Sequence, residues 1–253
     1  MQITTRDCPP RTVWALEQAG IHPLLARLFA ARGVQAPEEL DDNLAKLLSP
    51  NTFKGINEAA QILVEAIEQQ AHICIVADYD CDGATACAVG IRGLRLLGSK
   101  NVHYLVPDRV ADGYGLTPGI ASRVRASGAA VLVTVDNGIA SFEGVEKAHE
   151  LGMKVVVTDH HLPAMRDGIV AVPDADAIVN PNQPGCDFAS KTIAGVGVMF
   201  YVLLRMRALM RDAGVFDATT QPKLDHLLPL VALGTVADVV SLDANNRRLV
   251  AQG

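Results

Sequence analysis

Short apolar runs alternate with amphipathic segments along the chain from His72 onward. Runs rich in β-branched residues predict five strands, at Ile73 to Ala77, Val102 to Val106, Ala130 to Val135, Lys154 to Thr158 and Ala177 to Val179. Helical periodicity follows at Gly83 to Leu97, Pro118 to Ser127, Phe142 to Leu151, Ile193 to Asp212 and Leu224 to Leu233. Continuous apolar runs are typical of strands buried on both faces. The alternation therefore predicts an α/β fold, with a Rossmann-like parallel sheet and helical crossovers.

The first seventy residues have a different pattern. From Pro10 to about Gln70 the apolar positions follow a helical period and no strand is predicted. We expect a small helical N-terminal segment at 1–70 and the sheet-containing domain at 71–253. No apolar stretch has the roughly 18 residues of a membrane span, and the N-terminus has no apolar signal-peptide core, which together favour the cytoplasm.

Composition limits the possible classes of protein. With 253 residues, of which 49% are hydrophobic, the chain can bury one large core or two small ones. Its five cysteines are odd in number and form no C-x-x-C pair, which argues against a disulfide framework and a structural zinc site. The formal charge of −6 opposes nucleic-acid binding, which relies on Lys and Arg. Bound cations would offset that charge, as would a basic surface in sequence outside this chain.

Polar clusters follow three of the predicted strands directly. The first strand leads into Asp78-Tyr79-Asp80-Cys81-Asp82-Gly83, the third into Asp136-Asn137-Gly138 and the fourth into Asp159-His160-His161. The carboxyl ends of strands in an open α/β sheet line the crevice where ligands bind. We therefore expect the three clusters to meet at one site.

Each cluster also has a simpler interpretation. The spacing of Asp78, Asp80 and Asp82 fits the start of an EF-hand loop, but position twelve is Val89 rather than glutamate, and a strand precedes the segment. An Asp-Asn-Gly sequence after a strand is commonly a turn, and adjacent histidines can simply lie on the surface. Three such clusters at consecutive strand ends make these separate explanations less economical than a shared site.

The chemistry of the clusters favours cations with hard oxygen ligands. Several carboxylates and two histidines in one crevice would repel one another unless cations are bound there. Oxygen ligands with one or two imidazoles suit Mn²⁺ or Mg²⁺ better than zinc. Two such ions that share a carboxylate both activate water and stabilise charge at phosphorus, so the clusters predict phosphoester hydrolysis.

Four motifs in order resemble the DHH family of phosphoesterases. The fourth, Gly234-Thr235-Val236-Ala237-Asp238, joins the three clusters above. Further segments, Val106-Pro107-Asp108-Arg109, Gly113-Tyr114-Gly115-Leu116, Asn180-Pro181-Asn182 and Gly195-Val196-Gly197-Val198, are similar to the single-stranded-DNA exonucleases of that family. The glycines of the last segment alternatively serve close helix packing. The likeness covers about Ala71 to the end.

The resemblance implies roles for individual residues. It implies two Mn²⁺ or Mg²⁺ ions held by Asp80, Asp82, Asp136, His160 and Asp238. Asp136 is expected to bridge the ions, and His161 to act on the scissile phosphate or the leaving oxygen. Asp159 is expected to orient an imidazole, and Asp78 to support the site without binding metal. Some relatives that act on small substrates have a histidine ligand where this chain has Val76.

Two residues outside the clusters are candidates for binding substrate. Arg109 can hold a phosphate, and Tyr114 can contact a base or sugar, because single strands bind to cationic grooves and stacking aromatics. The alternatives are a salt bridge from Arg109 to Asp108 or Asp112, and simple packing for Tyr114.

The resemblance also implies an activity and leaves alternatives. We expect a 5′ exonuclease for single-stranded DNA that acts in repair and recombination, with helicase or single-strand-binding proteins as possible partners. A DHH enzyme for pyrophosphate, cyclic dinucleotides or very short oligonucleotides would share the metal site, and a scaffold without catalysis would not need intact motifs. Exonucleases of the family continue into a second domain, so we expect this chain to be a fragment. Its sequence does not define an oligomeric state.

Overall fold

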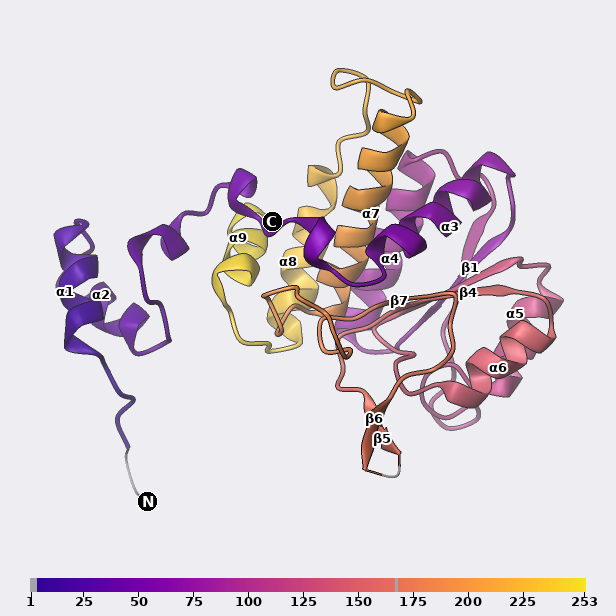
Figure 1. Ribbon diagram of the computed structural model, residues 1–253, viewed down its shortest axis with the longest axis horizontal. Helices are drawn as coiled ribbons and strands as arrows, with labels where there is room; N and C mark the ends of the chain where they lie inside the picture. Colours follow the sequence, from indigo (N-terminus) through magenta and orange to yellow (C-terminus); the bar gives the residue numbers. More distant parts are fainter. Residues whose placement is uncertain (1–3, 167) are drawn as a thin grey trace.

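A five-stranded parallel sheet forms the centre of the protein. The computed structural model describes residues 4–166 and 168–253, and its sheet has the strand order β2-β1-β3-β4-β7 (Figure 1). The strands are β1 (Ile73–Ala77), β2 (Val102–Leu105), β3 (Val131–Val135), β4 (Lys154–Thr158) and β7 (Ala177–Val179), and every neighbouring pair is parallel. The predicted α/β fold is confirmed, and each strand lies within one residue of its predicted bounds.

Helices cover both faces of the sheet. These are α3 (Ile56–Glu68), α4 (Cys81–Leu96), α5 (Pro118–Ala126), α6 (Phe142–Glu150) and α7 (Gly195–Asp212), whereas α8 (Leu228–Ala237) packs against α4 and α9 (Ala244–Gln252) packs against α8. Along β1, Ile73 and Ile75 join the core that contains α3, α4 and α7, whereas Cys74 and Val76 join the core of α5 and α6. Strand side chains alternate between faces, so one apolar run supplies both cores. No helix in the described residues is long and apolar enough to cross a membrane.

The N-terminal helices have a small core of their own. Helices α1 (Pro10–Gln18) and α2 (Pro23–Ala30) bury Leu16, Ala26, Ala30 and Val34 and lie apart from the sheet body (Figure 1). Short 3₁₀ turns η1 (Pro37–Leu40), η2 (Leu44–Lys46) and η3 (Pro50–Thr52) connect them to α3, which packs against α7 and β7. The described part of 1–70 contains no strand, in line with the prediction. The domain boundary at residue 70 stays a prediction.

Three local features differ from the sequence-based expectations. An antiparallel hairpin of β5 (Ala164–Arg166) and β6 (Ile169–Ala171) has strands too short to give a periodic signal. A 3₁₀ turn, η4 (Asp225–Leu227), occupies the start of the helix predicted from Leu224. Helix α9 was not predicted, although Asp243 caps it by accepting a hydrogen bond from the Asn246 N–H at 2.9 Å.

Candidate metal centre

Carboxylates and histidines from four segments meet at the carboxyl edge of the sheet. Three carboxylates follow β1, one follows β3, two histidines follow β4, and one carboxylate directly follows α8. Their ligand atoms form three overlapping groups, each within 4.8 Å: Asp78, Asp80 and Asp136; Asp82, His160 and Asp238; and Asp136, His160 and His161. The structure thus brings the predicted ligands together, and adds Asp78 to the groups that could hold a cation.

Asp136 occupies the middle of this cluster in an unusual backbone conformation. Its φ of 61° is left-handed, although it is not a glycine, and its side chain is buried. Burial raises the pKa of this carboxyl, and the nearby Asp82 raises it further. Such backbone strain costs on the order of 1–3 kcal/mol and concentrates at functional sites. The fold therefore holds a carboxylate where its charge is unfavourable unless a cation is present.

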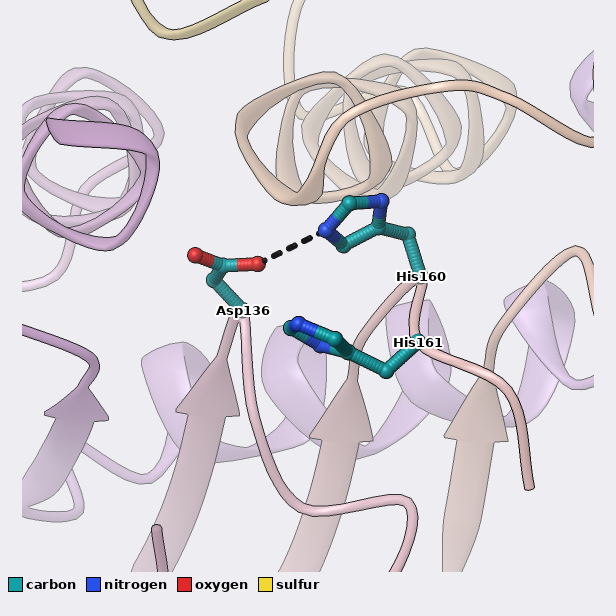
Figure 2. A group of neighbouring side chains, drawn as sticks. All are labelled: Asp136, His160 and His161. Carbon is teal, nitrogen blue, oxygen red and sulfur yellow. Dashed lines mark ion pairs between the residues drawn. The ribbon is translucent and has the colours of Figure 1, made fainter. Parts of the chain in front are cut away.

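His160 points its Nε2 atom at the same place as this carboxylate. Nε2 lies 3.1 Å from Asp136 Oδ1 (Figure 2), 3.6 Å from Asp238 Oδ2 and 3.8 Å from Asp82 Oδ2. Neither Nε2 of His160 nor Oδ1 of Asp136 has a hydrogen bond of acceptable geometry to any described residue, and both atoms are buried. Buried polar atoms are costly when unpaired. A divalent cation among them would satisfy both, so the residues present fit such an ion.

Asp82 links the cluster to the start of α7. Its two oxygens accept hydrogen bonds from the backbone N–H groups of Gly195, at 2.6 Å, and Val196, at 2.9 Å. Burial raises the pKa of Asp82 to about 6, although these N–H groups act in the opposite direction. Each carboxylate oxygen retains a second lone pair for a cation.

Gly195 is needed for close approach at this point. A Cβ atom there would lie 2.6 Å from Asp136 Oδ1 and 2.7 Å from its Cβ, which no side chain can accommodate without movement. The glycine-rich segment at the start of α7 therefore packs closely against the carboxylate–histidine cluster. This arrangement combines the two interpretations of the segment from sequence, the family motif and close helix packing.

Asp78 and Asp80 belong to the turn between β1 and α4. Asp80 caps α4, because its Oδ1 accepts a hydrogen bond from the Gly83 N–H at 2.9 Å, and the residue remains exposed. Asp78 is buried and accepts a hydrogen bond from the Tyr79 N–H at 2.7 Å, and burial raises its pKa. Asp238 also has a raised pKa, chiefly because of burial. The cluster thus contains several carboxyls whose charged form is disfavoured without cations.

Asp159 supports His161 rather than His160. Its Oδ1 lies 2.7 Å from His161 Nδ1 and accepts the backbone N–H groups of His160 and His161, and its Oδ2 accepts the Ile139 N–H. Burial favours the neutral acid, but the hydrogen bond from His161 and the backbone bonds outweigh it and hold the pKa of Asp159 low. That bond in turn raises the pKa of His161. Asp159 therefore fixes the imidazole next to the cluster.

Asparagines hold the surrounding loops in place. Asn180 and Asn182 donate hydrogen bonds to the backbone carbonyls of His161, at 3.0 Å, and His160, at 2.7 Å. Asn137, fully buried, donates to the carbonyls of Val76 and Val135, which joins the ends of β1 and β3. The sequence pointed to Asn180 and Asn182 only by resemblance, because an asparagine in a loop has no distinct pattern, whereas Asn137 lies in a polar cluster found from its place after a strand.

The two predicted substrate-binding residues lie beside the cluster with Tyr79 between them. The Arg109 guanidinium carbon is 4.9 Å from the centre of the Tyr79 ring, and Tyr79 packs edge-on to Tyr114 at 6.4 Å. Tyr114 also packs edge-on to His161 at 6.3 Å and is half-exposed. No salt bridge joins Arg109 to a described residue, and Asp112, one of its two candidate partners, pairs with Arg123 at 2.7 Å. Sequence reasoning missed Tyr79, which lies inside the first motif.

The fold and this cluster define an α/β protein with a carboxylate–histidine site suited to divalent cations. The model of the DHH family, N-terminal domain, matches residues 72–235, which include every residue of the cluster except Asp238. The chain belongs to the DHH family.

Similar proteins share most of this chain. It is 52% identical over 232 residues to the single-stranded-DNA-specific exonuclease RecJ of Haemophilus influenzae, covering 92% of this chain and 40% of that protein. The corresponding protein of Escherichia coli is 49% identical over 237 residues, with 93% and 40% covered. The chain thus spans about 40% of the length of these curated relatives.

Solved structures of two relatives have the same fold. RecJ of Thermus thermophilus in complex with Mn²⁺ matches with a TM-score of 0.75 at 30% identity, over 99% of this chain and 34% of that one. An exonuclease RecJ bound to manganese matches with a TM-score of 0.69 at 33% identity, over 81% of this chain and 49% of that one.

Proposed function

We propose that this chain carries the metal site of an exonuclease that hydrolyses phosphodiester bonds of single-stranded DNA from the 5′ end, in DNA repair and recombination. The observation that carries the proposal is that His160 Nε2 and Asp136 Oδ1, 3.1 Å apart at the centre of the carboxylate cluster, are both buried and have no hydrogen bond to any described residue. A site of this composition suits hard divalent cations. The two relatives described above, both named single-stranded-DNA-specific exonuclease RecJ, support the choice of substrate.

In this proposal two Mn²⁺ or Mg²⁺ ions are the cofactors. The residues that would hold them are Asp80, Asp82, Asp136, His160 and Asp238, with Asp136 shared between the two ions. Asp78, next to Asp80 and Asp136, would support the site without binding an ion. The occurrence of Asp136 in two of the three overlapping groups supports its shared role. When bound, such a pair of ions supplies Lewis acidity at phosphorus and lowers the pKa of the attacking water.

His161 would handle the proton of the leaving oxygen. Asp159 binds its Nδ1, so Nε2 is the nitrogen available to the substrate. The raised pKa of His161 favours the imidazolium, which can donate a proton to the departing 3′ oxygen and stabilise charge on the phosphate. Asp159 acts through this imidazole, as a positioning residue.

Arg109, Tyr79 and Tyr114 would guide the strand to the metal site. The edge-on ring packing from Tyr79 through Tyr114 to His161 gives a row of aromatic surfaces that ends at the cluster. Bases can stack on exposed aromatics whatever their sequence, and a guanidinium can bind the backbone phosphates. The chain's formal charge of −6 is consistent with binding that relies on these local contacts and on cations.

The proposed substrate also suggests which proteins would act with this enzyme and where in the cell it would work. Helicases or single-strand-binding proteins are the class of partner that would present such strands. We place the protein in the cytoplasm, where its five free cysteines would stay reduced.

The test is product analysis with Mn²⁺ on single-stranded oligonucleotides labelled at either end. Early release of labelled mononucleotide from the 5′-labelled strand alone supports the proposal and its polarity. Early release from the 3′ label would reverse the polarity. There are two controls. Double-stranded DNA should remain uncleaved by the unaltered protein, and single-stranded DNA should remain uncleaved by the Asp136→Asn variant.

Two further substrates separate the alternatives. Pyrophosphate and a cyclic dinucleotide test the small-substrate activity, and turnover of these alone would replace the exonuclease proposal. Inactivity on every substrate, together with no binding of Mn²⁺ in a calorimetric titration, would point to a scaffold.

A further inference from the structure

A cavity of about 540 Å³ lies against α7 and outside the metal cluster. Phe200 and Leu204 of α7 form one wall, and the segment of η2 and η3 and the loop that follows α7 form the others. None of the described residues that line it belongs to the groups that could hold a cation. Arg207, in the α7 wall, comes about 18 Å along the helix axis after Gly195, which donates to Asp82 of the cluster. The cavity is therefore separate from the site of the proposed hydrolysis.

The walls of this cavity are mainly apolar. Leu47 and Pro50 line it from the η2–η3 segment, and Pro222 and Leu224 line it from the loop that follows α7. Sites for small molecules commonly have volumes between about 300 and 1,000 Å³, apolar walls and few polar groups. The volume and the walls thus fit a small molecule with an apolar body.

Arg207 brings a half-buried positive charge into these walls. Its Nη1 donates a hydrogen bond to the Pro222 carbonyl oxygen at 3.1 Å, and no carboxylate of residues 4–166 or 168–253 forms a salt bridge with it. Burial lowers the pKa of this guanidinium, and the nearby Arg211 lowers it further. Since arginine stays charged in proteins, an anion beside Arg207 would be stabilising.

The other charged side chains of the wall leave one positive charge in excess. Lys223 and Asp225 line the cavity together with Arg207, and both are exposed, so two cations face one carboxylate. A carboxylate ligand carries one negative charge and can accept two parallel N–H bonds from a guanidinium. A phosphate would bring more negative charge into apolar surroundings near Asp225, which is costly. The charge balance therefore favours a carboxylate.

We propose that this cavity binds a small apolar molecule that carries one carboxylate group. The carboxylate binds Arg207, and the apolar body covers Phe200 and Leu204. Such a ligand joins α7 to the η2–η3 segment and to the loop that follows the helix, so it stabilises their packing. The inference is independent of the proposed nuclease activity, because the cavity lies outside the cluster.

Arg205 supplies a matched control on the same helix. It precedes Arg207 by two residues and does not line the cavity, and its Nε donates a hydrogen bond to Asn57 Oδ1 at 2.6 Å. Arg205→Gln therefore removes one positive charge from α7 without changing the cavity wall.

The experiment is a calorimetric titration, with Mn²⁺ present, that uses phenylpropanoate as the probe because it has an aromatic ring and one carboxylate. Phenylpropanamide lacks the charge of this probe, and acetate lacks its ring. For the unaltered protein we expect the amide to bind about tenfold more weakly than the carboxylate, since hydrogen bonds to charged groups have about this value. Acetate should give no measurable binding, because it covers little of the apolar wall.

The variants test the position of the probe. Arg207→Gln should bind phenylpropanoate about tenfold more weakly than the unaltered protein does, and should bind the amide almost equally well. Arg205→Gln should match the unaltered protein with both probes. The comparison of the two probes in the unaltered protein needs no variant, so it tests the inference even where Arg207→Gln does not fold.

Other outcomes overturn the inference. Absence of binding by the unaltered protein would remove the site, and equal affinity for the carboxylate and the amide would remove the role of the charge. Equal affinity of the unaltered protein and Arg207→Gln for phenylpropanoate would place the probe elsewhere, such as on bound Mn²⁺. Equal losses in the two arginine variants would show a general effect of charge on α7.

Discussion

Asp159 Oδ1 lies 2.7 Å from Nδ1 of His161, whereas Nε2 of the neighbouring His160 points at Asp136, 3.1 Å away. Two adjacent histidines thus have separate environments. The buried Asp159 holds His161, whereas His160 points at Asp136 in the candidate cation site (Figure 2). This difference supports the proposed roles of His161 in proton transfer and of His160 in metal binding, and variants can separate the two.

Replacing the carboxylate behind His161 should change the pH dependence of hydrolysis. In Asp159→Asn the hydrogen bond that raises the pKa of His161 weakens, so the pKa falls and the imidazolium is lost at lower pH. We expect kcat to fall by roughly 100-fold, with the alkaline limb of the pH–rate profile shifted to lower pH. His161→Gln should lose about the same activity and show no such limb. Unchanged Mn²⁺ affinity in both variants would confirm that neither residue is an essential ligand.

Removing the central carboxylate should abolish activity and stabilise the metal-free protein. Asp136→Asn retains the shape of the side chain, eliminates a buried carboxyl with a raised pKa, and places asparagine where a left-handed φ of 61° is better tolerated. We expect loss of Mn²⁺ binding and of hydrolysis, together with a higher Tm in chelator. Asp212→Asn, at an exposed site at the end of α7, is the control. A lower Tm for Asp136→Asn would contradict the electrostatic account.

Stability without metal should decrease as pH rises. Burial raises the pKa of Asp82 from 3.8 to about 6 and also raises that of Asp136. A carboxyl with a raised folded-state pKa destabilises the fold progressively as pH increases from its unfolded value through its folded one. We expect the Tm in chelator to fall by roughly 5 °C or more between about pH 5 and pH 8. Mn²⁺ should therefore stabilise the protein more at the higher pH. A constant difference across this range would refute the prediction.

A methyl group at the start of α7 should disturb the metal cluster. The Cβ of Gly195→Ala would collide with Asp136, and overpacking of this kind costs about 1–3 kcal/mol. We expect a lower Tm and at least tenfold weaker Mn²⁺ binding. Gly119→Ala is the matched control, because its Cβ would meet only Thr117 at 3.8 Å, within a helix. Equal behaviour of the two variants would show that the approach of α7 is not critical.

The sheet and the position of the cluster could be predicted because both follow from local pattern. Apolar runs marked the five strands. Asp78, Asp136 and Asp159 directly follow strands, with His160 next to Asp159, so a parallel arrangement had to bring these segments together. The antiparallel hairpin escaped detection because three-residue strands contain too little alternation.

Relationships between distant segments could not be predicted in this way. The pairing of Asp82 with the N–H groups of Gly195 and Val196 joins residues more than one hundred positions apart. Nor could the sequence show that Asp159 binds the imidazole of His161 rather than that of His160, because the two rings are adjacent in the chain. The cation–π contact of Arg166 with Phe142 depends likewise on how the hairpin folds back toward α6.

The candidate ligands come from segments that begin at Asp78 and end at Asp238. A chain still growing on the ribosome therefore holds an incomplete set until the segment after α8 has emerged. Incomplete sets bind cations weakly, because each ligand lost removes both charge and geometry. Synthesis would thus complete the candidate metal site only after the sheet that carries most of it has had time to form.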